Sequence, residues 1–368
     1  MRDVVNCIKK YVEITNDDKF KHHWKLLSHK LIAGVQNSYK KPENHIVKII
    51  ESIINSVGTF KTQGKSLKFS IKTNSIFIHG NKSYVEFSYD GNNTKRELGD
   101  IIFILSIVCN SKKYFEKMTI NQVKKSKDVS WSFSSRSAKE QVYLLSRFPT
   151  FKGAKNSLIP SNEYSLPNYL GCLGSHGLLY FPGDFALISS KKLEVLLSKK
   201  STISLYDLFK LEMETIQTIM CPFCLLFDYD IEECFYFFHK LIHYLPGYYR
   251  YSPFVCNLPI LGNNCIAFNS YDFSNKYLLG HIGELVYAKN IPYNSSALRF
   301  LQVLLNAIKR KAENDRLENI LNFIGSFYSN EYANSDDGSG REENEGFNYE
   351  RGSIGIIHTI VDLEEFNK

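Results

Sequence analysis

Two long apolar stretches, Asp100 to Val108 and Tyr114 to Lys124, are separated only by the polar segment Cys109-Asn110-Ser111-Lys112-Lys113. Strand-like runs joined by so short a polar turn predict an antiparallel hairpin. This hairpin places the middle of the chain in a β-sheet. The neighbouring segments must supply the other strands and the helices that cover the sheet.

The segments around the hairpin have a regular order. Apolar residues at helical spacing follow Pro42 and predict an amphipathic helix, which ends near Gly58. Strand-like runs at 67–71, 75–79 and 84–89, a helix over 137–147, and apolar runs at 178–181 and 185–188 complete the order. Helix, strands, hairpin, helix and strands predict an α/β (α+β) core with a mixed sheet flanked by helices.

The rest of the chain divides by composition into further regions. We expect an N-terminal helical extension over 1–41, the sheet core over 42–190, and a mainly helical module over 191–330. Residues 331–352 are acidic and rich in Gly, Ser and Asn, which predicts a flexible linker. Residues 353–368 begin with a β-branched run and predict a C-terminal strand that adds to a sheet edge of its own chain or of a partner.

Composition excludes several classes of protein. The chain of 368 residues is 43% hydrophobic and 23% charged, which is typical of globular protein. No apolar run approaches the roughly 18–20 residues of a membrane span, and the N-terminus has no apolar core for export. We therefore expect no membrane association and a cytoplasmic location, with the eight cysteines as free thiols or possible metal ligands and not as a disulfide framework. The formal net charge of +7 suits a phosphate-bearing partner but does not identify one.

Three polar side chains gather at the open end of the predicted hairpin. Gln122 and Lys124 are two residues apart and share one face of their strand, and Asp100 at the start of the paired strand returns alongside them. A carboxylate and an amide oxygen are ligands that Mg²⁺ accepts. A nearby lysine can orient an attacking water and offset phosphorane charge. These residues predict metal-assisted hydrolysis.

Asp100, Gln122 and Lys124, with the element order of residues 42–190, resemble the PD-(D/E)xK superfamily of restriction-endonuclease-like nucleases. In that family an Asp near the start of one strand and an acid-x-Lys on the next strand belong to an αβββαβ core. The resemblance implies a Mg²⁺- or Mn²⁺-dependent endonuclease that cuts DNA in preference to RNA, with Asp100 and Gln122 as metal ligands. It also implies an antiviral defence role against phage or plasmids, gated by a partner subunit or by homo-oligomer formation.

The chain departs from the family pattern at Gln122, where most members have Glu or Asp. We consider three acids that could supply the missing carboxylate: Glu97, Glu51 on the preceding helix, and Glu86 on a strand. The alternative hypothesis is a catalytically inactive nuclease-like subunit that binds nucleic acid or a partner protein. In either case we expect lysines of the hairpin to contact nucleic acid, namely Lys112, Lys113, Lys125 and Lys127.

Two other motifs carry weaker expectations. Cys221 and Cys224 have half of a zinc-ribbon spacing, but no second pair follows at the right distance, so zinc is not expected. The glycine-rich segment 171–177 lacks the Lys-Ser/Thr of a phosphate loop and predicts turns. His176 within it is a secondary candidate for the active site.

Overall fold

The computed structural model describes residues 2–57, 60–61, 68–78, 83–109, 112–219, 266–289, 293–309 and 354–363. The helices are α1 (Arg2–Thr15), α2 (Asp18–Ser38), α3 (Glu43–Ser56), α4 (Arg136–Arg147), α5 (Ser190–Leu197), α6 (Leu205–Ile219), α9 (Ser270–Leu278) and α10 (Ser295–Lys309). The strands of the main sheet are β1 (Phe60–Lys61), β2 (Phe69–Ile78), β5 (Ile101–Cys109), β6 (Lys112–Lys125), β10 (Gly174–Tyr180), β11 (Asp184–Ser189), β13 (Ile266–Ala267), β14 (Glu284–Ala288) and β15 (Ile354–Leu363). Two smaller sheets contain β3 (Tyr84–Tyr89), β4 (Asn92–Glu97), β8 (Phe151–Gly153) and β9 (Glu163–Tyr164), and β7 (Ser130–Ser132) with β12 (Thr202–Ser204).

The main sheet is mixed, as the sequence predicts. Its order is β1-β2-β15-β5-β6-β10-β11-β13, with β14 paired to the first part of β6. The predicted hairpin forms as the antiparallel pair β5–β6, while β10 runs parallel to β6 and β15 runs parallel to β5. The runs at 67–71 and 75–79 belong to one continuous strand, β2, so the prediction of two separate strands there is wrong.

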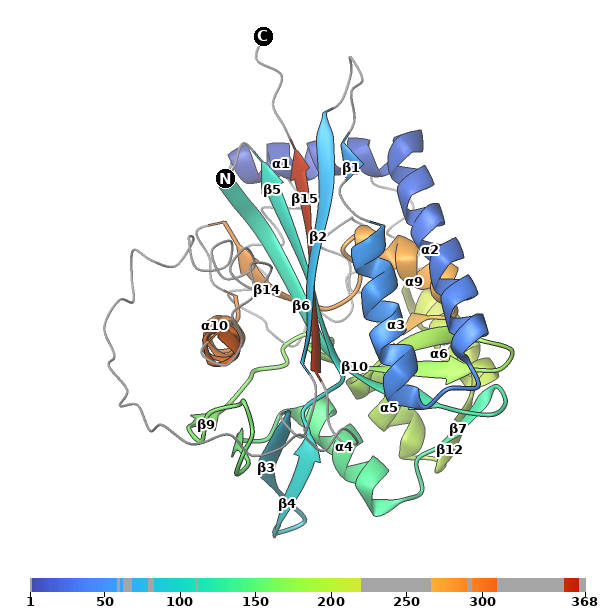
Figure 1. Ribbon diagram of the computed structural model, residues 1–368, viewed down its shortest axis with the longest axis vertical. Coiled ribbons are helices and arrows are strands. Elements are labelled where there is room, and N and C mark those ends of the chain that lie inside the picture. Colours follow the sequence, from blue (N-terminus) through green and yellow to red (C-terminus); the bar gives the residue numbers. More distant parts are fainter. Residues whose placement is uncertain are drawn as a thin grey trace.

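The C-terminal strand lies in the interior of the main sheet, between β2 and β5 (Figure 1). It is antiparallel to β2 and parallel to β5 along almost its whole length. The prediction that this strand adds to a sheet edge is therefore wrong. Its partners belong to the same chain, and Ile356, Ile357 and Val361 are fully buried there.

Helices cover both faces of the main sheet. Helices α2, α3 and α9 lie on one side, and α10 lies on the other (Figure 1). Successive residues of β5 therefore enter two different cores: Ile101, Phe103 and Leu105 face one, and Ile102 and Ile104 face the other. This explains why β5 is a continuous apolar run, as strands buried on both faces are.

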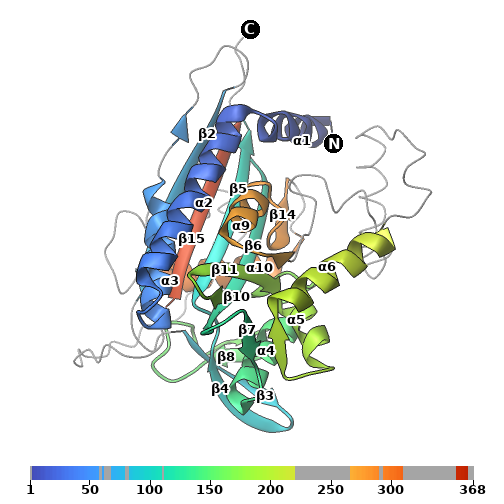
Figure 2. The ribbon, with the colours of Figure 1, turned by 90° about the vertical axis from the view of Figure 1, so that its right-hand side faces the viewer.

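The segments before and after the predicted core, 1–41 and 191–330, pack onto the same main sheet. Residues of α2 such as Leu27 and Leu31 are buried in the core on one side of the main sheet, and this long helix packs against α3 (Figure 2). Within 191–330, β13 pairs with β11 and β14 pairs with β6, so this region contributes strands as well as helices to the core. Residues 331–352 lie outside the described residues.

Candidate active site

Three neighbouring strands bring the predicted residues together. The β5–β6 register pairs Ile101 with Asn121, which places Asp100 opposite Gln122. The β6–β10 register pairs Gln122 directly with His176. Asp100, Gln122 and His176 therefore form a row across the sheet, and Lys124 follows two residues beyond Gln122 on the same face.

Asp100 is held by two donors from β6. A single oxygen, Oδ2, accepts hydrogen bonds from Gln122 Nε2 at 2.6 Å and from the backbone N–H of Val123 at 2.7 Å. Burial raises the pKa of Asp100 well above its usual value, and the negative charges of Glu97 and Glu43 raise it further. Such a carboxylate is short of positive charge, which is the condition that a bound cation relieves.

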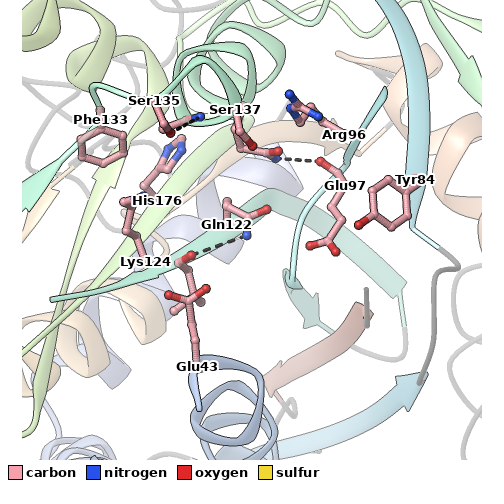
Figure 3. Close-up of a pocket in the computed structure, with 13 residues that line it drawn as sticks. Glu43, Tyr84, Arg96, Glu97, Gln122, Lys124, Phe133, Ser135, Ser137 and His176 are labelled. Atoms are coloured by element: carbon pink, nitrogen blue, oxygen red, sulfur yellow. Dashed lines mark hydrogen bonds between the residues drawn. The ribbon is translucent and has the colours of Figure 1, made fainter. Parts of the chain in front are cut away.

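A cavity of about 310 Å³ opens beside this row. Gln122 lies near its centre, with Glu97 and Tyr84 on one side and His176, Phe133 and Ser135 on the other (Figure 3). Lys124 lies on the His176 side, where its ammonium group is 5.3 Å from the ring centre of Phe133. Asp100 is not a lining residue, and it is only 9% exposed.

The cavity contains an acid that the sequence analysis missed. Glu43 is the first residue of α3 and lines the cavity, and its Oε2 accepts a hydrogen bond from the backbone N–H of Lys125 at 2.6 Å. Burial is the largest cause of its raised pKa. The sequence signal that could have indicated Glu43 is the Pro42-Glu43 start of the predicted helix. A helix that begins near the hairpin presents its first side chains to the hairpin.

The three acids considered for the missing carboxylate have different positions. Glu97, the last residue of β4, lines the cavity, and burial raises its pKa. Glu51 lies eight residues into α3 from Glu43, about 12 Å along the helix, and is not a lining residue. Glu86 is 4.0 Å from Lys152 on the β3–β8 pair and does not line the cavity either. The structure thus brings only Glu97 of these three to the site.

The hairpin lysines do not form one basic surface. Lys113 is buried and forms an ion pair with Glu116 at 2.8 Å, about 36 Å along β6 from Lys124. Lys112 is exposed at the same distant end. Lys125 donates to the carbonyl groups of Tyr39 and Lys41. The prediction that Lys113 contacts nucleic acid is wrong, because its ammonium group is inside the protein. Lys127 is exposed just beyond the end of β6.

His176 is part of the site, although the sequence predicts turns around it. Its strand, β10, is rich in glycine because neighbours approach closely: a Cβ at Gly174 would lie 2.0 Å from the Leu145 carbonyl oxygen. The His176 ring is 1% exposed, and burial lowers its pKa to about 3, so the ring is neutral at physiological pH. Packing against α4 explains Gly174, close approach of Asn121 on β6 explains Gly177, and Gly171, before the strand, has the positive φ (75°) that the prediction of turns expects.

The donor chemistry at the cavity fits a hard divalent cation. Gln122 Oε1 is buried without a hydrogen-bond partner, while Nε2 of the same amide is engaged by Asp100. An unpartnered amide oxygen near three carboxylates is a set that Mg²⁺ accepts. The side chains are not drawn together into a ligand cluster, since among the described residues no three His, Cys, Asp or Glu side chains are grouped for a metal.

Comparisons with known proteins give no relative: no family model, curated protein or solved structure matches this chain. In the described part of the chain no helix has the length and apolarity needed to cross a membrane. Cys221 and Cys224 lie outside the described residues, so the expectation about zinc stays a prediction. Cys7 and Cys109 are buried thiols outside any disulfide, whereas Cys172 is disulfide-bonded, so the expectation of free thiols is wrong for Cys172.

Proposed function

We propose that this protein is a metal-dependent nuclease with a restriction-endonuclease-like core that hydrolyses phosphodiester bonds of DNA in preference to RNA. The observation that carries the proposal is the β5–β6 register, which places Asp100 opposite Gln122 with Lys124 beside the same cavity. Glu43 and Glu97 add the carboxylates that Gln122 does not supply. The preference for DNA rests on the family resemblance alone.

Each side chain has a role in this proposal. Asp100, Gln122 and the cavity acids Glu43 and Glu97 would hold Mg²⁺, which when bound polarises the phosphate and lowers the pKa of an attacking water. Lys124 positions that water and offsets the negative charge that develops on phosphorus. Water adds to phosphorus, the bond from phosphorus to one ester oxygen breaks, and that oxygen leaves with a proton.

A cleavage assay tests the proposal. Purified protein is incubated with supercoiled, linear and single-stranded DNA and with RNA, in Mg²⁺ or Mn²⁺ and in EDTA. We expect metal-dependent cutting that falls at least 100-fold in Lys124→Ala, because one preorganised charge at a transition state contributes about 2.7–4 kcal/mol. Lys112→Ala is the matched control, since this exposed lysine lies about 40 Å away along β6.

One observation favours the second candidate, an inactive nuclease-like subunit that binds nucleic acid or a partner protein. The Oδ2 atom of Asp100 is already occupied by two donors. Under this hypothesis the wild type cuts none of the four substrates in any metal, and Lys124→Ala changes binding alone.

A further inference from the structure

One wall of the cavity is formed by the beginning of α4. Ser135 is the N-cap, and its side chain accepts a hydrogen bond from the Ala138 N–H at 3.2 Å. Ser135, Ser137 and Ala138 all line the cavity. The first N–H groups of a helix have no partner within the helix and carry its positive dipole end, which favours anions. No acidic residue in the first turn of α4 opposes this preference.

A second and independent feature of the same wall is the unpartnered nitrogen of His176. Nδ1 of the ring is 3.0 Å from Ser190 Oγ on α5, and Nε2 is buried with no hydrogen-bond partner. A polar atom that is buried and unpaired destabilises the folded protein, and a ligand that pairs with it removes this cost. Because Nδ1 can accept from the Ser190 hydroxyl, Nε2–H is available as a donor to a molecule in the cavity.

The cavity holds charges of both signs: Arg96 lines it on the Glu97 side, paired with Glu140, and Glu43 lies close to Lys124 (Figure 3). Lys124 lies on the side of His176 and α4, whereas Glu97 lies across Gln122 from them (Figure 3). Glu43 approaches from α3 and is engaged by the Lys125 N–H. Arg136, in the first turn of α4, is paired with Glu140, so its charge is partly compensated. The donors and the Lys124 ammonium group thus share with the acids a cavity of about 310 Å³, which is at the small end of ligand pockets.

We propose that the N-terminus of α4, His176 Nε2 and Lys124 form a phosphate subsite that holds a phosphodiester group of the nucleic-acid strand beside the carboxylates. The N–H groups of Arg136 and Ser137, the imidazole N–H and the ammonium group donate to its non-bridging oxygens, while the Ala138 N–H stays with the Ser135 cap. The inference rests on the proposed function for the identity of the strand. Binding at this subsite needs neither metal nor cleavage, so it can be tested separately.

The test is an NMR titration of the full-length, isotope-labelled protein in EDTA. The probes are inorganic phosphate and, in a second arm, the dinucleotide thymidylyl-thymidine, whose one phosphate is a diester. We expect saturable shifts of the Arg136, Ser137 and Ala138 amide signals and of the His176 ring signals with both probes. A response to inorganic phosphate alone would contradict a site for strand phosphodiesters.

Ser137→Asp is the informative variant. An acid in the first turn favours the helix itself but repels phosphate, so we expect at least tenfold weaker binding in a folded protein. Ser132→Asp introduces the same charge at an exposed position that does not line the cavity, and it should bind like the wild type. His176→Gln should also weaken binding, with no shift left at residue 176.

The outcomes separate the two proposals. Absence of saturable shifts, or equal weakening in Ser132→Asp and Ser137→Asp, would overturn the subsite even if the protein cuts DNA. Site-specific phosphate binding by a protein that cuts nothing would uphold the subsite and reject the nuclease activity. Cleavage together with specific binding would support both.

Discussion

At the scale of single residues, Asp100 provides a test with a definite sign. Its pKa is raised in the folded protein, so the folded state holds its proton to higher pH than the unfolded state does. Its contribution to stability is therefore fully present below the unfolded pKa of about 3.9 and is lost as pH rises through the folded pKa. At pH values above the folded pKa, each unit by which folding raises the pKa lowers the free energy of unfolding by about 1.4 kcal/mol.

Asp100→Asn should remove this cost while keeping the local structure. Both hydrogen bonds go to Oδ2, so the amide oxygen of Asn can accept both. We expect the variant to gain stability relative to the wild type as pH rises from 4 to 8, measured by urea unfolding at each pH. A difference between the two proteins that does not change with pH would contradict the raised pKa.

The same variant tests metal binding without cleavage. Mn²⁺ at 100 times its dissociation constant should stabilise the wild type by about 2.7 kcal/mol, and we expect little effect on Asp100→Asn. Glu86→Gln is the matched control, because it also changes a carboxylate to an amide but lies away from the cavity. Equal stabilisation of Asp100→Asn and the wild type would mean that the metal binds elsewhere.

How much of the site the sequence predicts depends on how local the determining contacts are. Asp100, Gln122 and Lys124 could be placed together because a hairpin with a short turn fixes their register. Glu43 and His176 could not, because their positions depend on how α3 and α4 pack against strands far away in the sequence. Lys113 and Glu116 look like surface charges in an alternating strand, and only the three-dimensional structure shows that they are buried together.

At the scale of elements, β15 is the strand on which the sheet depends most. Its ten residues pair with β2 on one side and with β5 on the other, and Ile356, Ile357 and Val361 are fully buried. The β-branched content of this segment predicts a strand, but nothing local indicates partners about 250 residues earlier in the chain. Its place between β2 and β5 could therefore not be predicted from the sequence.

A chain truncated after residue 353 should fail to fold cooperatively. Without β15, strands β2 and β5 face each other across an unfilled strand position, and the Asp100 carbonyl loses the hydrogen bond from the Gly355 N–H, 2.7 Å long. We expect loss of the cooperative thermal transition, measured by circular dichroism. Addition of a peptide spanning 350–368 should restore the transition, and a scrambled peptide should not.

A truncated chain that unfolds at the wild-type temperature would show that the sheet does not need this strand. The truncation also bears on the site, since Gly355 bonds to the residue that anchors it. The peptide-restored protein should therefore regain metal-dependent stabilisation along with its thermal transition.

At the scale of the whole molecule, the net charge of +7 overstates the basic surface available near the site. Lys113 and Lys117 are buried, Lys125 is bound to backbone carbonyl groups, and Arg136 is paired with Glu140. Of the lysines of the hairpin and the segment that follows it, Lys124 is beside the cavity and Lys127 is exposed nearby. A nucleic-acid strand bound here would meet few cations.

Single-stranded DNA should therefore bind with a shallow salt dependence. Neutralising two or three phosphates predicts a slope of about −2 in log affinity against log salt concentration, at about 0.7 per phosphate for single strands. The measurement is fluorescence anisotropy of a labelled oligonucleotide in EDTA over 50–300 mM KCl. Lys124→Ala should make the slope shallower by about 0.7, whereas Lys112→Ala should leave it unchanged, because Lys112 lies at the far end of β6. A slope steeper than about −5 would mean that at least seven phosphates are neutralised, more than the described cations near the cavity can contact, and would place most of the binding surface elsewhere on the chain.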